Sequence, residues 1–123
     1  TAVMMSDIVV ITLPLNDQTN NLFSRELLFT MKKGSILLNV GRGRIIDEDA
    51  LVDALESDHL GFCALDVMAV EPIDKDSKLW TCKNLLLTPH VSGTGYYTKE
   101  RLWKTFEGNC YQFIQNKPLK NLI

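Results

Sequence analysis

The chain has 123 residues, of which 46% are hydrophobic and 23% are charged. This length and balance fit one compact domain, and they exclude a disordered segment and two independent hydrophobic cores. Thirteen basic against fifteen acidic side chains give a net charge of −2, which supplies no basic field for a nucleic acid. The sequence also carries none of the usual nucleic-acid-binding motifs, so we expect a small, non-polymeric ligand.

The cysteines and the apolar stretches bear on location. Cys63, Cys82 and Cys110 are odd in number and form no Cys-x-x-Cys pair, which argues against a disulfide framework or a zinc knuckle and favours a reducing, cytoplasmic compartment. The most apolar stretches, 7–15 and 35–40, are shorter than the ~20 residues of a membrane span. The sequence starts with Thr1 rather than Met, and this start favours a fragment or a trimmed chain as a hypothesis to test.

Four short apolar runs predict β-strands. They are rich in aliphatic and β-branched residues, are nearly unbroken by polar ones, and are bounded by Gly, Pro, Asn or Asp. Such runs are typical of strands that are buried on both faces of a parallel sheet. The predicted strands cover residues 8–13, 35–40, 61–67 and 84–88.

Three segments between and after these strands predict helices. A short helix over 24–31 ends at Lys32-Lys33-Gly34, where basic side chains and a glycine suit the end of a helix. A second helix covers 47–56, with Asp47 as its N-cap and apolar side chains on one face. The longest covers 98–116 and carries an apolar stripe formed by Leu102, Phe106, Cys110 and Phe113.

The order β-α-β-α-β-loop-β-α predicts a doubly wound parallel sheet, in which right-handed crossovers place helices on the faces. Ligands bind such sheets beyond the carboxyl ends of the strands. An arginine, two carboxylates and a histidine follow the predicted strands closely, so we expect them to converge on one rim. These residues are Arg42, Asp66, Glu71 and His90.

Arg42 is flanked by two glycines directly after a predicted strand. Glycine allows the backbone to approach a ligand closely, and a guanidinium is a planar fork that suits a carboxylate. Arg42 is therefore a candidate for binding a carboxylate substrate. The alternative is a structural arginine in a turn, paired with a nearby acid.

His90 follows Pro89 at the end of the last predicted strand. An imidazole suits proton transfer near neutral pH, and contact with Glu71 would fix which ring nitrogen faces a substrate. The alternatives are a structural histidine and a solvated loop glutamate. His59, the other histidine, lies in a polar turn that we expect at the surface.

Arg42, Glu71 and His90 together suggest hydride chemistry on a 2-oxo or 2-hydroxy acid. In this hypothesis Arg42 binds the carboxylate and the carbonyl oxygen, and His90 exchanges the alcohol proton. Such a reaction needs a redox cofactor to carry the hydride.

The same residues lie in three ordered motifs. Val40-Gly41-Arg42-Gly43 is followed by Ile46-Asp47, Ala64-Leu65-Asp66-Val67 by Glu71-Pro72, and Leu87-Thr88-Pro89-His90 by Ser92-Gly93. In order and spacing they resemble the D-isomer-specific 2-hydroxyacid dehydrogenases, from about Asp7 to the C-terminus.

The resemblance implies an α/β fold, the C-terminal half of a doubly wound, Rossmann-type nucleotide-binding domain. It implies NAD or NADP as the cofactor, a small 2-hydroxy or 2-oxo acid as the substrate, and a homodimer in the full-length parent. Arg42 would bind the substrate carboxylate, His90 would be the acid/base, and Glu71 its partner. Asp66 would hold the nicotinamide carboxamide, and the backbone would line the dinucleotide at Leu13, Pro14, Val40, Gly41, Ser92 and Gly93.

One family motif is absent from the sequence. The G-x-G-x-x-G turn that binds the pyrophosphate does not occur. We therefore expect residues 1–117 to be a partial NAD(P)-binding domain and 118–123 a stub returning towards a substrate domain. The chain alone is then expected to show little or no dehydrogenase activity. The alternative is a non-catalytic nucleotide-sensing or assembly module derived from the same family.

Overall fold

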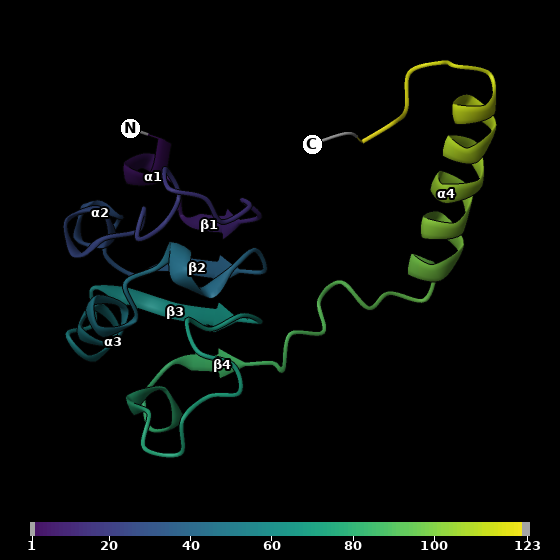
Figure 1. The fold of residues 1–123 in the computed structure, drawn as a ribbon. Helices are drawn as coiled ribbons and strands as arrows, with labels where there is room; N and C mark the ends of the chain where they lie inside the picture. The colour runs from purple at the N-terminus through teal and green to yellow at the C-terminus, as the bar shows by residue number, and fades with distance from the viewer. Residues whose placement is uncertain (1, 122–123) are drawn as a thin grey trace. The chain divides into compact units, whose positions relative to one another are not determined.

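The structure, a computed structural model, describes residues 2–121 of the chain (Figure 1). It divides into two compact units, Thr1–Val91 and Ser92–Ile123. The first unit holds a parallel sheet with its helices, and the second holds one long helix. Part of the expected 118–123 stub, residues 122 and 123, lies outside the described residues.

The sheet has four parallel strands in the order β1-β2-β3-β4. The strands are β1 (Ile8–Ile11), β2 (Ser35–Asn39), β3 (Leu60–Leu65) and β4 (Leu85–Leu87). All four predicted strands and their parallel pairing are confirmed. Each strand ends one or two residues before the predicted limit, because the last residues of each apolar run already belong to the loops at the carboxyl edge.

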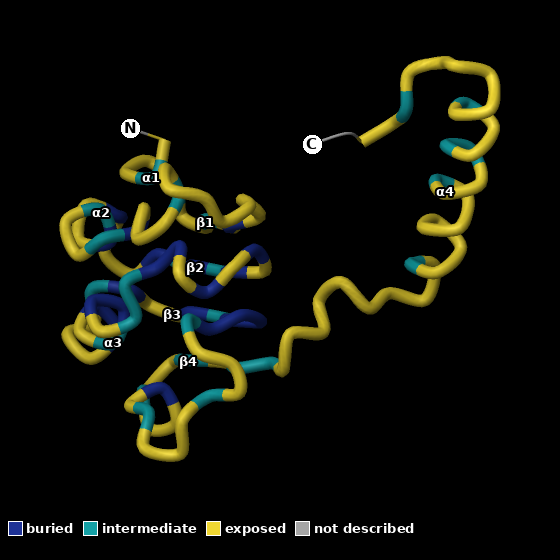
Figure 2. Tube along the Cα trace, in the orientation of Figure 1, coloured by how far each residue is buried: buried dark blue, intermediate teal, exposed yellow. Residues whose placement is uncertain are grey.

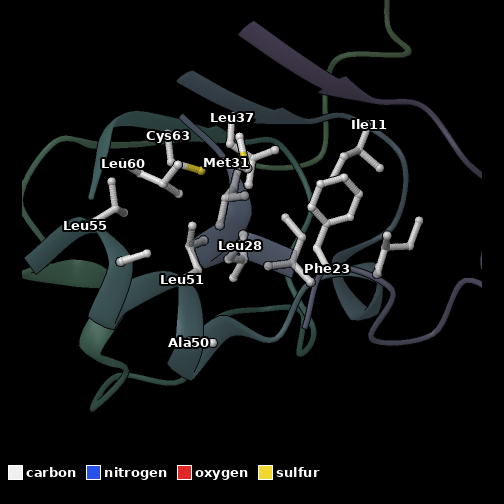
Figure 3. Close-up of a cluster of buried hydrophobic side chains, with 14 of the residues drawn as sticks. Ile11, Phe23, Leu28, Met31, Leu37, Ala50, Leu51, Leu55, Leu60 and Cys63 are labelled. Atoms are coloured by element: carbon white, nitrogen blue, oxygen red, sulfur yellow. The ribbon is translucent and has the colours of Figure 1, made fainter. Parts of the chain in front are cut away.

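Helices α2 (Arg25–Thr30) and α3 (Glu48–Glu56) connect the first three strands. Ser24 and Asp47 are their N-caps, and the Asp47 carboxylate accepts the Ala50 N–H at 3.1 Å. Both helices contribute to a core that includes the fully buried Leu28, Leu51 and Leu37 (Figure 3). Three short elements were not predicted, namely α1 (Ala2–Met5), the 3-10 helix Gly43–Ile45 and the 3-10 helix Lys78–Trp80.

The second face of the sheet differs from the expectation. Ile8, Val10, Phe62 and Leu86 are between 37% and 57% exposed, so burial of the strands on both faces was a wrong prediction for this chain. Figure 2 shows that β1 is largely exposed. The crossovers from β1 to β3 all advance in one direction, and right-handed connections then place α2 and α3 on the same face. A doubly wound sheet covers its second face with the helices of its other half.

The second unit contains α4 (Thr98–Ile114). The helix is confirmed, and it ends two residues before the predicted limit. It has no buried residue, and its predicted apolar stripe is exposed, with Leu102 at 65% and Phe113 at 73%. Among residues 2–121, no helix has the length and apolar character needed to cross a membrane.

His59 is not the surface residue that its polar neighbours suggested. It is half-buried, and its ring stacks on Phe29 with 4.9 Å between the ring centroids. Its backbone links α3 to the sheet, since its N–H donates to the Ala54 carbonyl and its carbonyl accepts the Gly34 N–H. The stacking partner is 30 residues away in the sequence, so the local pattern did not indicate it.

Candidate active site

The candidate site is the set of loops that follow the carboxyl ends of the four strands. Because all the strands are parallel, their carboxyl ends lie at one edge of the sheet. The loops there carry Leu13-Pro14, Gly41-Arg42-Gly43, Asp66 to Glu71 and Pro89-His90. The predicted residues of the first unit therefore share one edge of the sheet.

The structure brings Glu71 and His90 into direct contact. Nδ1 of His90 lies 2.7 Å from Oε2 of Glu71, and Oε1 of Glu71 accepts the Met68 N–H at 2.8 Å. The hydrogen bond from His90, supported by that from Met68, holds the pKa of Glu71 below its ordinary range. An ionised carboxylate only accepts hydrogen bonds, so Nδ1 carries the proton of this bond. Nε2 is then the ring nitrogen through which His90 can exchange a proton with a ligand.

The backbone of His90 is left-handed, with φ of +54°. This conformation costs a residue other than glycine about 1–2 kcal/mol, so the surrounding structure must impose it. The turn is closed by the His90 N–H, which donates to the Thr88 carbonyl at 3.0 Å. This turn therefore sets the direction in which the His90 side chain points from the end of β4.

Asp66 holds this turn from both sides. Its carboxylate is buried, and Oδ1 accepts the Thr88 hydroxyl at 2.6 Å and the Val91 N–H at 2.9 Å. Thr88 and Val91 flank Pro89-His90, so one buried carboxylate at the end of β3 fixes the loop after β4. The sequence analysis did not assign a role to Thr88, although the hydroxyl directly before Pro89-His90 was a visible signal.

Arg42 is exposed, and its guanidinium donates to the Gly41 carbonyl at 2.7 Å. In the part of the chain that the structure describes, no acidic side chain pairs with it. The structural alternative, an arginine paired with a nearby acid, is therefore not what the structure shows. No hydrogen bond among residues 2–121 joins Arg42 to Glu71 or His90.

The buried Asn39 holds the turn that carries Arg42. Its Oδ1 accepts the Gly41 N–H at 3.0 Å, and its Nδ2 donates to the Arg42 carbonyl at 2.9 Å. Sequence reasoning missed this residue. A polar side chain at the end of an apolar strand was the available signal, because a buried amide must find partners.

The two glycines beside Arg42 serve contacts between loops. A Cβ on Gly41 would lie 2.7 Å from the Leu13 carbonyl oxygen, and one on Gly43 would lie 1.9 Å from the Met68 carbonyl carbon. Glycine is thus required for neighbouring backbone to pack closely, whereas the sequence analysis related it to close approach of a ligand. The Gly41 contact brings together two predicted cofactor-lining positions, Leu13 and Gly41.

Two other features complete the site. A cavity of about 420 Å³ is lined by Glu71 and His90 together with apolar side chains that include Met68, Ile73 and Trp80. The predicted cofactor residues Ser92 and Gly93 belong to the second unit.

A parallel four-stranded sheet, with its connecting helices and with polar side chains at the carboxyl ends of its strands, has the architecture of a Rossmann-type nucleotide-binding domain. Residues 1–92 match the family model described as D-isomer specific 2-hydroxyacid dehydrogenase, NAD binding domain. The chain belongs to this family, and the cofactor class of the matched domain is NAD or NADP.

Named relatives and solved structures agree with this assignment. Over 123 residues, the chain is 35% identical to glyoxylate/hydroxypyruvate reductase B of Escherichia coli, of which it covers 38%. The crystal structure of a D-isomer specific 2-hydroxyacid dehydrogenase from Xanthobacter autotrophicus Py2, in complex with NADPH and MES, superposes with a TM-score of 0.89 at 34% identity. That comparison covers 98% of this chain and 49% of the other.

The NADPH-dependent glyoxylate/hydroxypyruvate reductase of Sinorhizobium meliloti, crystallised with NADP and sulfate, gives a TM-score of 0.86 at 27% identity, covering 98% of this chain and 39% of the other. The chain therefore spans between about a third and a half of the relatives that it matches.

Proposed function

We propose that this chain supplies the acid/base pair and the carboxylate-binding arginine of an NAD(P)-dependent D-2-hydroxyacid dehydrogenase. The observation that carries the proposal is the 2.7 Å contact between His90 Nδ1 and Glu71 Oε2 at the carboxyl edge of a parallel sheet. A histidine paired with a carboxylate can accept and return an alcohol proton. The reaction of a 2-hydroxyacid dehydrogenase, the family to which the chain belongs, requires such a transfer.

In the proposed reaction the proton and the hydride leave a 2-hydroxy acid separately. The hydroxyl proton passes to Nε2 of His90 while the C2–H bond breaks and C2 becomes a carbonyl carbon. NAD or NADP, when bound, supplies the acceptor for the hydride and, in reduction, its donor. Glu71 stabilises the imidazolium that forms and keeps the ring in the required tautomer, since its carboxylate accepts from Nδ1.

Arg42 is proposed to bind the carboxylate of the substrate. A guanidinium donates two parallel hydrogen bonds to a carboxylate, which fixes the orientation of the acid as well as its charge. The exposed side chain has no acidic partner among residues 2–121, and its turn is held by the buried Asn39. These two observations favour an arginine that is positioned for a ligand.

The residues present fit the nicotinamide end of the cofactor. Asp66 offers a buried, fixed carboxylate at the end of β3, which suits a carboxamide N–H donor. Main chain at Leu13, Pro14, Val40 and Gly41 lies at the ends of β1 and β2, and Gly41 projects no side chain there. Ser92 and Gly93 complete the proposed cofactor residues.

The proposal implies a longer polypeptide that contains these residues, and the test is turnover by that polypeptide. Reductases among the relatives are named for glyoxylate and hydroxypyruvate, so both acids are assayed with NADH and with NADPH. We expect His90→Gln to lower kcat by about 10²–10⁴-fold, the usual effect of losing a general acid/base. His59→Gln, which changes the histidine stacked on Phe29, is the control and should retain activity.

Cofactor binding without turnover by the unmodified protein would contradict the dehydrogenase. It would support the alternative, a non-catalytic nucleotide-sensing or assembly module. Full activity of His90→Gln would remove His90 from the proposed mechanism.

A further inference from the structure

Glu48, the first residue of α3, reaches the loop that carries Glu71. We propose that Glu48 is a positioning residue that holds this loop so that Glu71 meets His90. The inference rests on the proposed role of the Glu71–His90 pair and adds a residue that the pair depends on. Its basis is the hydrogen bond from the Ala69 N–H to Oε1 of Glu48, at 2.6 Å.

Two carboxylates bind two successive amides of this loop. The Met68 N–H donates to Oε1 of Glu71 at 2.8 Å, and the Ala69 N–H donates to Glu48. The first bond is local, since it joins residues three apart, whereas the second joins residues 21 apart. Glu48 therefore attaches the loop to α3, an element that is distant from it in the sequence.

The element that provides Glu48 is firmly anchored. Asp47 caps α3 directly before Glu48, and Leu51 and Leu55 of the same helix are fully buried in the core. A hydrogen bond from a fixed helix end transmits that rigidity to the loop, because charge-assisted bonds to backbone N–H groups are short and strong. A solvated acid at the same position would give the loop no such support.

The loop of Glu71 also packs against the turn that carries Arg42. Gly43, the next residue, packs against the Met68 backbone so closely that a Cβ would lie 1.9 Å from the Met68 carbonyl carbon. The loop is thus in contact with Gly43 at Met68 and with Glu48 at Ala69. Both contacts hold the loop of Glu71, the one from Gly43 at the turn that carries Arg42 and the one from Glu48 at the start of α3.

The test is a carboxyl NMR titration of Glu71 in the 123-residue chain. Asp49→Ala is the matched control, because Asp49 is the next residue of α3 and its carboxylate forms an exposed ion pair with Lys78. Glu48→Gln keeps an oxygen that accepts the Ala69 N–H but removes the charge. Hydrogen exchange of the Ala69 amide reports directly on the proposed bond.

The direction in which the Glu71 pKa changes distinguishes a loss of positioning from a loss of charge. Loss of a negative charge near Glu71 would lower its pKa further. Loss of positioning in Glu48→Ala weakens the hydrogen bond from His90, so we expect the Glu71 pKa to rise towards its ordinary value of 4.5. Glu48→Gln and Asp49→Ala should leave the Glu71 pKa as low as in the unmodified chain or lower, because each removes a negative charge without loss of positioning. Ala69 exchange should accelerate in Glu48→Ala alone.

A Glu71 pKa in Glu48→Ala that is unchanged or lower would overturn the inference, as would failure of Glu48→Gln to protect Ala69. His90→Gln separates this inference from the proposed function. If that change leaves the Glu71 pKa unaltered, the Glu71–His90 pair itself is wrong. If it raises the pKa while Glu48→Ala does not, the pair stands and only the role of Glu48 fails. Thermal unfolding followed by circular dichroism confirms that each variant folds.

Discussion

Single residues at the sheet edge hold the site together through backbone contacts. Asn39 binds the Arg42 turn, Asp66 binds the His90 turn, and Glu48 binds the loop of Glu71. Each of these side chains bonds to an N–H or a carbonyl of a loop, or to the Thr88 hydroxyl beside it. The proposed reacting side chains are therefore placed by polar residues with no assigned contact to the substrate.

Gly43→Ala tests how closely the site loops pack. The new Cβ would meet the Met68 backbone at 1.9 Å, and backbone cannot yield as a side-chain end can. We expect a loss in the free energy of unfolding of at least about 1–3 kcal/mol, the usual cost of overpacking, measured by urea denaturation of the first unit.

The control is Gly108→Ala in α4, where a Cβ meets nothing within 4 Å. Alanine is a better helix former than glycine by roughly 0.5–1 kcal/mol, so this change should not destabilise the sheet unit. Equal stability of Gly43→Ala and the unmodified chain would show that the Gly43–Met68 contact is looser than described.

At the scale of elements, the strands and the helix caps followed from local sequence. Apolar runs located all four strands, and Asp47 was recognised as an N-cap because its signal lies within one helical turn. Two residues whose partners are distant in the chain, Glu48 and His59, were not recognised from the sequence. In the sequence, Glu48 is one of several acidic residues at the start of a helix, and only the folded structure shows that it accepts a hydrogen bond from the Ala69 N–H. His59 was misjudged for the same reason, since Phe29 approaches it from another helix.

The cysteines give a prediction that contrasts a strand with a helix. Cys63 in β3 is fully buried, and burial raises the pKa of its thiol to about 12. Cys110 in α4 is exposed. Because the thiolate is the reactive form and must be accessible, we expect iodoacetamide at neutral pH to label Cys110 quickly and Cys63 only after unfolding. Mass spectrometry of tryptic peptides measures both, and rapid labelling of Cys63 in the folded chain would contradict the described core.

At the scale of the whole molecule, the two faces of the sheet differ in burial. Helices α2 and α3 cover one face of the sheet, while apolar side chains such as Val10 and Leu86 remain exposed on the other. The relatives are two to three times as long. The proposed acid/base pair lies within the residues present, but the glycine-rich turn that binds pyrophosphate in such domains does not occur in the sequence.

Because the glycine-rich turn does not occur in the sequence, we expect the 123-residue chain to keep the Glu71–His90 contact but to bind the cofactor weakly. Much of the affinity for a dinucleotide comes from the pyrophosphate at a helix N-terminus, so the 123-residue chain should bind NADH weakly and reduce glyoxylate or hydroxypyruvate slowly or not at all. The measurement is loss of NADH absorbance, with the full-length glyoxylate/hydroxypyruvate reductase B of Escherichia coli, a relative of the chain, as the positive control. The Glu71–His90 contact needs no cofactor, so the low Glu71 pKa should persist in the isolated chain even though turnover is lost. Substantial turnover by the 123 residues alone would mean that cofactor binding here does not depend on a glycine-rich turn.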